Sequence, residues 1–76
     1  MNVEKLDESE KFIFIWQYGQ LGDFKAALIQ VIMLADKNNR AKLRLGFPNE
    51  VDGYINYSRT KGWWQEVQRK AGISDV

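Results

Sequence analysis

The pattern of apolar and polar positions predicts a chain built from short helices. The clearest period lies in residues 23–36, where apolar side chains recur at offsets of 3, 4, 7, 10 and 11 from Phe24. This spacing is typical of three turns of α-helix. The residues concerned are Phe24, Ala27, Leu28, Val31, Leu34 and Ala35. Asp23 precedes them and is the expected N-cap.

The same helix also carries apolar residues on its other side. Ile29 and Met33 fall near the side opposite the main stripe, with Ala26 beside them. A helix that is apolar nearly all round is either central in a bundle or has a second face that meets a partner. For so small a chain we favour the central position. In the alternative, Ile29 and Met33 would form the contact of a homodimer.

A first helix is predicted at residues 8–18. Acidic residues and a capping residue precede the apolar run at 12–16, and this order is typical of a helix start. The run is rich in β-branched and aromatic residues, so a buried strand is the alternative. Gly19 and Gly22 are expected to end the element.

Residues 41–47 are ambiguous, because they alternate apolar and polar side chains as a strand does. Ala41 and Leu45 nevertheless lie one helical turn apart, and the segment consists mainly of strong helix formers. We therefore expect a short helix, preceded by a capping turn at residues 36–39.

Two further helices are expected after this segment. Pro48 suits the first turn of one, and Gly53 inside it indicates a close helix contact. Its inward stripe is predicted to contain Val51, Tyr54, Ile55 and Ser58. The last helix spans about residues 62–71, with Trp64, Val67 and Ala71 on one face, and Gly72 stops it.

These elements predict an all-α fold, a compact single-domain bundle of four to five short helices over residues 1–76. Residues 1–6 and 73–76 are expected to be flexible ends.

The chain contains no histidine and no cysteine in its 76 residues. Histidine is the commonest general base and a frequent metal ligand, and cysteine is the thiol nucleophile. Acid pairs occur at Glu50 and Asp52 and at Glu8 and Glu10, but each lies in a predicted helix start, where acids favour the helix dipole. We therefore predict a non-enzymatic protein with no catalytic residue, no cofactor and no metal site.

No apolar run approaches the ~20 residues of a membrane helix. The first ten residues are acidic, unlike the basic start of a signal peptide. A cytoplasmic protein without a membrane partner is the expectation.

Charge is distributed unevenly along the chain. Residues 1–36 hold three basic and six acidic side chains, whereas residues 37–76 hold eight basic and four acidic ones. Basic groups beside exposed aromatic rings are typical of proteins that bind single-stranded nucleic acid. A nucleic-acid-binding accessory protein is therefore the alternative function, and its candidate residues are Arg40, Lys42, Arg44 and Lys61.

The adjacent residues Trp63 and Trp64 support a different function. Neighbouring helical positions are about 100° apart, so both rings cannot face one core equally. Trp64 continues the apolar stripe, which leaves Trp63 at its margin. Because tryptophan and arginine are common interface anchors, we predict a protein partner as the first choice. The candidate anchors are Trp63, Arg59, Arg69 and Tyr57.

Residues 43–54, Leu-Arg-Leu-Gly-Phe-Pro-Asn-Glu-Val-Asp-Gly-Tyr, resemble a segment of small uncharacterised helical proteins of bacterial phages and integrated mobile elements. Residues 20–24, which precede an alanine-containing helix, show a similar likeness. The resemblance implies a small helical protein from such a setting. It implies no site residue and no specific activity.

Overall fold

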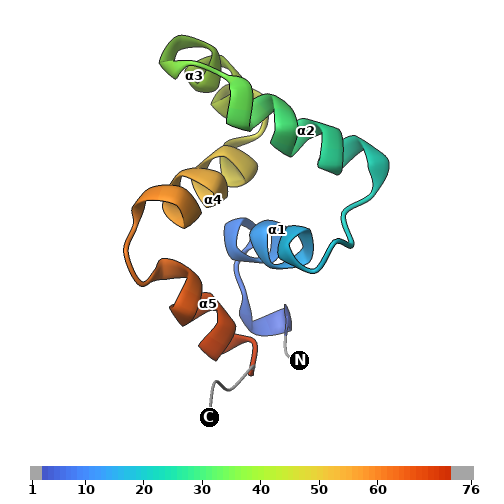
Figure 1. Ribbon diagram of the computed structural model, residues 1–76, viewed down its shortest axis with the longest axis vertical. Helices are drawn as coiled ribbons and strands as arrows, with labels where there is room; N and C mark the ends of the chain where they lie inside the picture. The colour runs from blue at the N-terminus through green and yellow to red at the C-terminus, as the bar shows by residue number, and fades with distance from the viewer. Residues whose placement is uncertain (1–2, 73–76) are drawn as a thin grey trace.

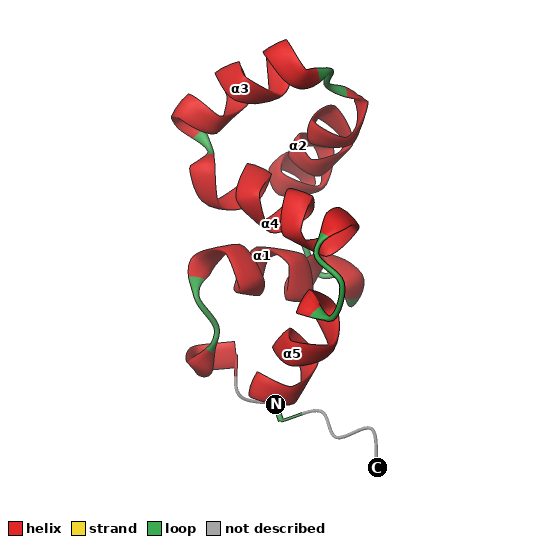
Figure 2. Cartoon of the chain, turned by 90° about the vertical axis from the view of Figure 1, so that its left-hand side faces the viewer, coloured by secondary structure: helices red, strands yellow, loops and turns green. Residues whose placement is uncertain are grey.

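The computed structural model describes residues 3–72, and in that range it contains only helices, turns and loops (Figures 1 and 2). The predicted all-α class is confirmed, and both ambiguous segments are helical. The elements are the 3₁₀ helix η1 (Val3–Lys5) and the α-helices α1 (Glu8–Gln17), α2 (Asp23–Leu34), α3 (Lys37–Gly46), α4 (Pro48–Arg59) and α5 (Trp63–Lys70).

Two helices begin where the sequence places an acidic cap. The carboxylate of Asp7 accepts a hydrogen bond from the Glu10 N–H at 2.8 Å, and Glu10 accepts one from the Asp7 N–H at 3.0 Å. This reciprocal capping box satisfies two N–H groups that the helix leaves free. Asp36 caps α3 in the simpler way, by accepting from the Asn39 N–H at 2.8 Å.

The predicted cap of α2 is wrong. Gly22 is the N-cap and makes no side-chain hydrogen bond, while Asp23 is the first residue of the helix. An acid in the first turn still interacts favourably with the positive end of the helix dipole, so the residue suits either position.

The central position predicted for residues 23–36 is also wrong. The central helix is α4, which packs against each of the other four α-helices, and its most extensive contact is with α1. Along the 40 Å length of the molecule, α2 and α3 form one end and α5 the other, with α1 and α4 between them (Figure 1).

Gly53 explains why α1 and α4 approach so closely. A Cβ at this position would lie 2.7 Å from the backbone oxygen of Ser9 and 3.1 Å from the Ile13 side chain. Only glycine fits such an approach without a shift of one helix, which confirms the predicted close contact. Val51, on the same helix, is completely buried as predicted, but Ser58 is exposed.

The end of the molecule formed by α5 includes the start of the chain. Leu6 is buried against Phe14, Val67 and Ala71, so the start of the chain contributes to this core cluster. Residues 1–2 and 73–76, where flexibility was predicted, lie outside the described residues.

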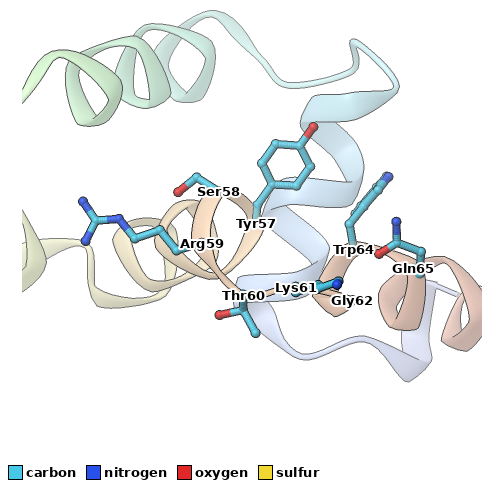
Figure 3. A pocket seen from close by; sticks show the side chains of 8 residues that line it. All are labelled: Tyr57, Ser58, Arg59, Thr60, Lys61, Gly62, Trp64 and Gln65. Carbon is cyan, nitrogen blue, oxygen red and sulfur yellow. The ribbon is translucent and has the colours of Figure 1, made fainter.

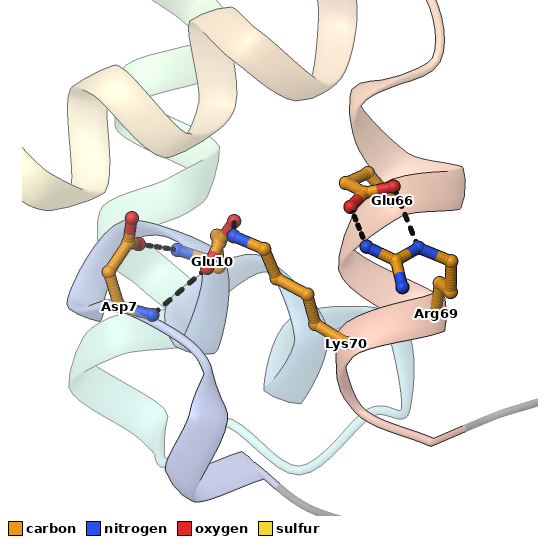
Figure 4. Close-up of polar contacts among 5 residues, drawn as sticks. All are labelled: Asp7, Glu10, Glu66, Arg69 and Lys70. Atoms are coloured by element: carbon orange, nitrogen blue, oxygen red, sulfur yellow. Dashed lines mark hydrogen bonds and ion pairs between the residues drawn. The ribbon is translucent and has the colours of Figure 1, made fainter.

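An ion pair at this same end of the molecule links two residues that lie 60 positions apart in the sequence. The Lys70 ammonium donates to the Glu10 carboxylate at 2.7 Å (Figure 4). The hydrogen bond to Glu10 raises the pKa of Lys70 above its usual value. Because Glu10 is buried, this carboxylate depends on the lysine and on the Asp7 N–H for the contacts it would otherwise make with water.

Candidate functional site

The predicted aromatic anchor site forms only in part. Tyr57 meets Trp16 edge-on, with ring centroids 5.4 Å apart, and meets Trp64 in the same manner at 5.7 Å. An open depression of about 650 Å³ lies beside them at the α4–α5 connection (Figure 3). Its lining includes Tyr57 and Trp64, so two of the rings contribute to the surface and to the packing between helices.

The four predicted anchors do not come together at this depression. Trp63 packs against the core and does not line the depression. Arg59 contributes to the lining, but its side chain extends away from Trp64 (Figure 3). Arg69 is hydrogen-bonded to Glu66, with Nε 3.0 Å from Oε2, and this bond lowers the pKa of Glu66 (Figure 4).

The basic residues proposed for nucleic acid are also dispersed. Arg44 donates to both oxygens of Asp52, at 2.6 and 2.9 Å, and this contact lowers the pKa of Asp52. Arg40 is partly buried and donates to the backbone oxygens of Ile32 and Ala35. Lys61 lies beyond the opposite end of α4. Of the four, only Lys42 is an exposed cation of α3 with no ion-pair partner in residues 3–72.

The residues proposed for a homodimer do not form a surface pair either. Ile29 is only 1% exposed and belongs to the core with Phe12 and Ile13. Met33 is 41% exposed, but Ile29 does not accompany it at the surface. A contact between copies that needs Ile29 is therefore excluded by its burial.

The most exposed apolar side chains lie instead on the outward sides of α2 and α3. Phe24 is 66% exposed, Leu34 85% and Leu45 88%. Phe24, Val31 and Leu34 follow one stripe of α2, at offsets of seven and three residues. The residues of α2 that face the core are Leu28, Ile29 and Ile32, and all three are buried.

A groove lies between the exposed stripe of α2 and the neighbouring side of α3. Its volume is about 390 Å³, and it is mainly apolar. The residues that line it are Val31, Leu34, Ala35, Asn39, Lys42 and Leu43, and we call it the α2–α3 groove. Outside the groove, the centroid of the Phe24 ring lies 6.1 Å from that of the Phe47 ring.

The helices that form this groove carry a net positive charge. The segment 23–46 holds five basic residues and two acidic ones, a net charge of +3. Lys42 lines the groove, and neither it nor Lys37 has a carboxylate partner within residues 3–72. The surface thus combines exposed aliphatic side chains with uncompensated cations.

The sequence contained a signal for this surface. The apolar residues on all sides of α2 predicted either a central helix or a second face that meets a partner, with Ile29 and Met33 on that face. In the structure Ile29 is buried, and the exposed apolar residues are Phe24, Val31 and Leu34 of the main stripe. Periodicity identifies a helical face without showing which face is covered.

Two kinds of feature are absent from residues 3–72. No helix there is both long enough and apolar enough to cross a membrane. No group of three or more acidic side chains in that range is arranged to hold a metal ion.

No protein-family model, curated protein or solved structure matches the chain.

Proposed function

We propose that this protein is a small binding module whose partner is another protein, and that its contact surface is the α2–α3 groove. The observation that carries the proposal is the exposure of Leu34, which lines the groove, on a helix whose core-facing residues Leu28, Ile29 and Ile32 are buried. It acts by binding, with no chemical step of its own.

The energetic argument follows from the exposed area. Full burial of one leucine side chain contributes about 1.5–3 kcal/mol, so Leu34 alone offers about that much to a partner in the groove. Exposed apolar side chains gathered on one surface are typical of interaction sites. The aromatic rings at Tyr57 and Trp64 offer less, because they already contact one another.

The charges indicate the chemistry of the partner. Lys42 lies in the groove wall and Lys37 begins the same helix, without a carboxylate partner for either in residues 3–72. A partner segment that presents aliphatic side chains flanked by Asp or Glu would complement both features. An amphipathic helix of this composition fits an apolar groove between two helices. A second copy of this chain would bring like charges together at α3, so it is the less favourable occupant.

The resemblance of residues 43–54 to small helical proteins of phages and mobile elements implies no function, so it neither adds to this proposal nor opposes it. The nucleic-acid alternative is less favoured, because Arg44 is paired with Asp52 and Lys61 lies beyond the opposite end of α4.

The test uses two leucines that differ only in their position. Leu34 and Leu45 are almost equally exposed, but only Leu34 lines the groove. A photo-crosslinking amino acid at position 34 should capture a partner peptide that is apolar with acidic flanks. In partner titrations, we expect Leu34→Ser to weaken binding by about tenfold or more and Leu45→Ser by less than about threefold, as loss of one buried leucine implies.

Three results would contradict the proposal. Equal losses for the two serine variants would indicate non-specific adhesion. A cross-linked dimer that Leu34→Ser dissociates would replace the protein partner with a second copy. A steep salt-dependent complex with a single-stranded oligonucleotide, unaffected by Leu34→Ser, would favour the nucleic-acid alternative.

A further inference from the structure

A second cleft lies on the other side of α3, between α3 and α4. Its volume is about 570 Å³, which is within the usual range for sites that hold small molecules. Its lining is mainly apolar, and Ile55 and Val51 of α4 belong to this apolar part, which we call the floor. Cationic side chains from both helices also line the cleft. It is separate from the α2–α3 groove, with which it shares only Ala35 at the turn.

Four cations converge on this cleft from two helices. Lys37, Arg40 and Arg44 come from α3, and Arg59 comes from the last turn of α4. The last turn of α4 and the first turn of α3 therefore line one space, although Arg59 and Lys37 are far apart in sequence. Figure 3 shows Arg59 directed away from the aromatic side of the α4–α5 connection, which agrees with this placement.

The carboxylates nearby do not balance these charges. Asp52 is engaged by Arg44 through two hydrogen bonds. Asp36 lines the cleft, but its Oδ1 accepts from the Asn39 N–H as the cap of α3. Within residues 3–72, Lys37, Arg40 and Arg59 have no carboxylate partner.

Arg40 is the best-fixed of the four. Its Nη2 donates to the Ala35 oxygen at 3.2 Å and to the Ile32 oxygen at 3.4 Å, and its guanidinium lies 5.6 Å above the Tyr54 ring. Its Nε is the one buried side-chain polar atom in residues 3–72 that lacks a hydrogen-bond partner. A rigid guanidinium loses less freedom when it binds an anion than a mobile one does.

We infer that the α3–α4 cleft binds a small organic phosphate. The phosphate oxygens would be held by Lys37, Arg40 and Arg59, and an apolar body would rest on Ile55. Arginine suits this role because its planar fork matches two phosphate oxygens at once. The floor distinguishes the site from a plain patch of surface charge, which would favour an inorganic ion equally.

The experiment is a titration of the whole chain followed by NMR of arginine Nε–H signals, with phenyl phosphate, inorganic phosphate and chloride as probes at equal ionic strength. Saturable shifts of the Arg40 and Arg59 signals are expected with phenyl phosphate, with an affinity about fivefold or more above that of inorganic phosphate. Chloride should give no saturable change.

Matched variants locate the site. Arg59→Gln and Lys37→Gln should each weaken phenyl phosphate binding by about five- to tenfold, as removal of one charged hydrogen bond implies. Lys25→Gln removes a cation of α2 that does not line the cleft, so it should leave the affinity unchanged. Leu34→Ser should also leave it unchanged, which separates this test from that of the partner-binding groove.

Two outcomes would overturn the inference. Equal weakening by Lys25→Gln and Arg59→Gln would show that net charge alone attracts the anion. Equal affinity for phenyl phosphate and inorganic phosphate would show that the apolar floor takes no part, and the assignment to an organic phosphate would be wrong.

Discussion

The α1–α4 pair and the α2–α3 pair contain similar helices but use them differently. Between α1 and α4, Ile13 is completely buried and Gly53 lets the backbones approach closely. In the second pair, α3 has no buried residue at all. It packs against α4 through the half-buried Leu43, and it is also held by the Asp36 cap, by the Arg40 hydrogen bonds to the end of α2 and by the Arg44–Asp52 pair.

This difference separates stability from recognition. Buried apolar contacts such as those of Ile13 stabilise a small chain that has no disulfide. The second pair also buries Leu28, Ile29 and Ile32 of α2, but it leaves Leu34 and Leu45 exposed and free for contacts outside the chain. Four changes would break or sharpen the comparison, and they follow in order of decreasing effect on stability.

The largest effect is expected for Ile13→Ala. Removal of a buried isoleucine side chain typically costs about 2–5 kcal/mol in the free energy of unfolding. Leu34→Ala is the matched change in the second pair and should alter that free energy by no more than about 0.5 kcal/mol, because the side chain is mostly exposed. Urea unfolding followed by tryptophan fluorescence measures both. A similar loss of unfolding free energy in the two variants would show that the two helix pairs do not differ in their contribution to stability.

Gly53→Ala should give the next largest effect. The new Cβ would meet the Ser9 backbone, so α1 and α4 must separate slightly, at a cost of about 1–3 kcal/mol that exceeds the gain in helix propensity. Gly46→Ala is the control, because no atom lies within 4 Å of its Cβ position and its φ is not positive. It should stabilise α3 by up to about 1 kcal/mol. Thermal melts distinguish the opposite signs.

How far the sequence predicted these features depends on the kind of signal. Caps and breakers act locally, so Asp7, Asp36 and Pro48 placed helix starts correctly. Gly53 also indicated its contact, because an unfavourable residue inside a helix needs a reason. Asp23 was misplaced by one position, since an acid suits both the cap and the first turn.

The arrangement of helices could not be predicted in the same way. The pattern of α2 offered two apolar faces, and only the tertiary fold determines that Leu28 and Ile32 are covered while Leu34 is exposed. The cleft at Arg59 and Lys37 joins residues distant in sequence, so no local motif reveals it. Arg40 was assigned to nucleic acid because composition cannot show that its guanidinium binds backbone oxygens.

The Lys70–Glu10 pair, in the well-packed part, should make stability fall at alkaline pH. The pKa of Lys70 is raised above 10.5, so the contact is fully present below that pH and is lost as pH rises through the raised value. The wild-type protein should therefore lose stability more steeply than Glu10→Gln between about pH 9 and about pH 12. Glutamine still serves in the capping box, which restricts the change to the charge. Parallel pH profiles would contradict the assigned contact.

The Arg44–Asp52 pair should respond at the opposite end of the pH scale, and with a smaller effect because both side chains are exposed to water. The pKa of Asp52 is lowered below 3.8, so its contribution is present above that pH and is lost as pH falls through the lowered value. Amide chemical shifts of α3 should move in this range. Arg44→Gln should reduce that movement, and equal movement in both proteins would contradict the assigned pair.

The two described ends of the chain lie near the same pole of the molecule, and α3 occupies the other (Figure 1). Leu6 and Ala71 share one buried cluster, which holds the segments beside those ends together. A tether attached beyond Val3 or beyond Gly72 would therefore project away from the α2–α3 groove. Immobilised by either end on a sensor surface, the protein would display its apolar groove outward, and the orientation would be nearly the same for both attachments.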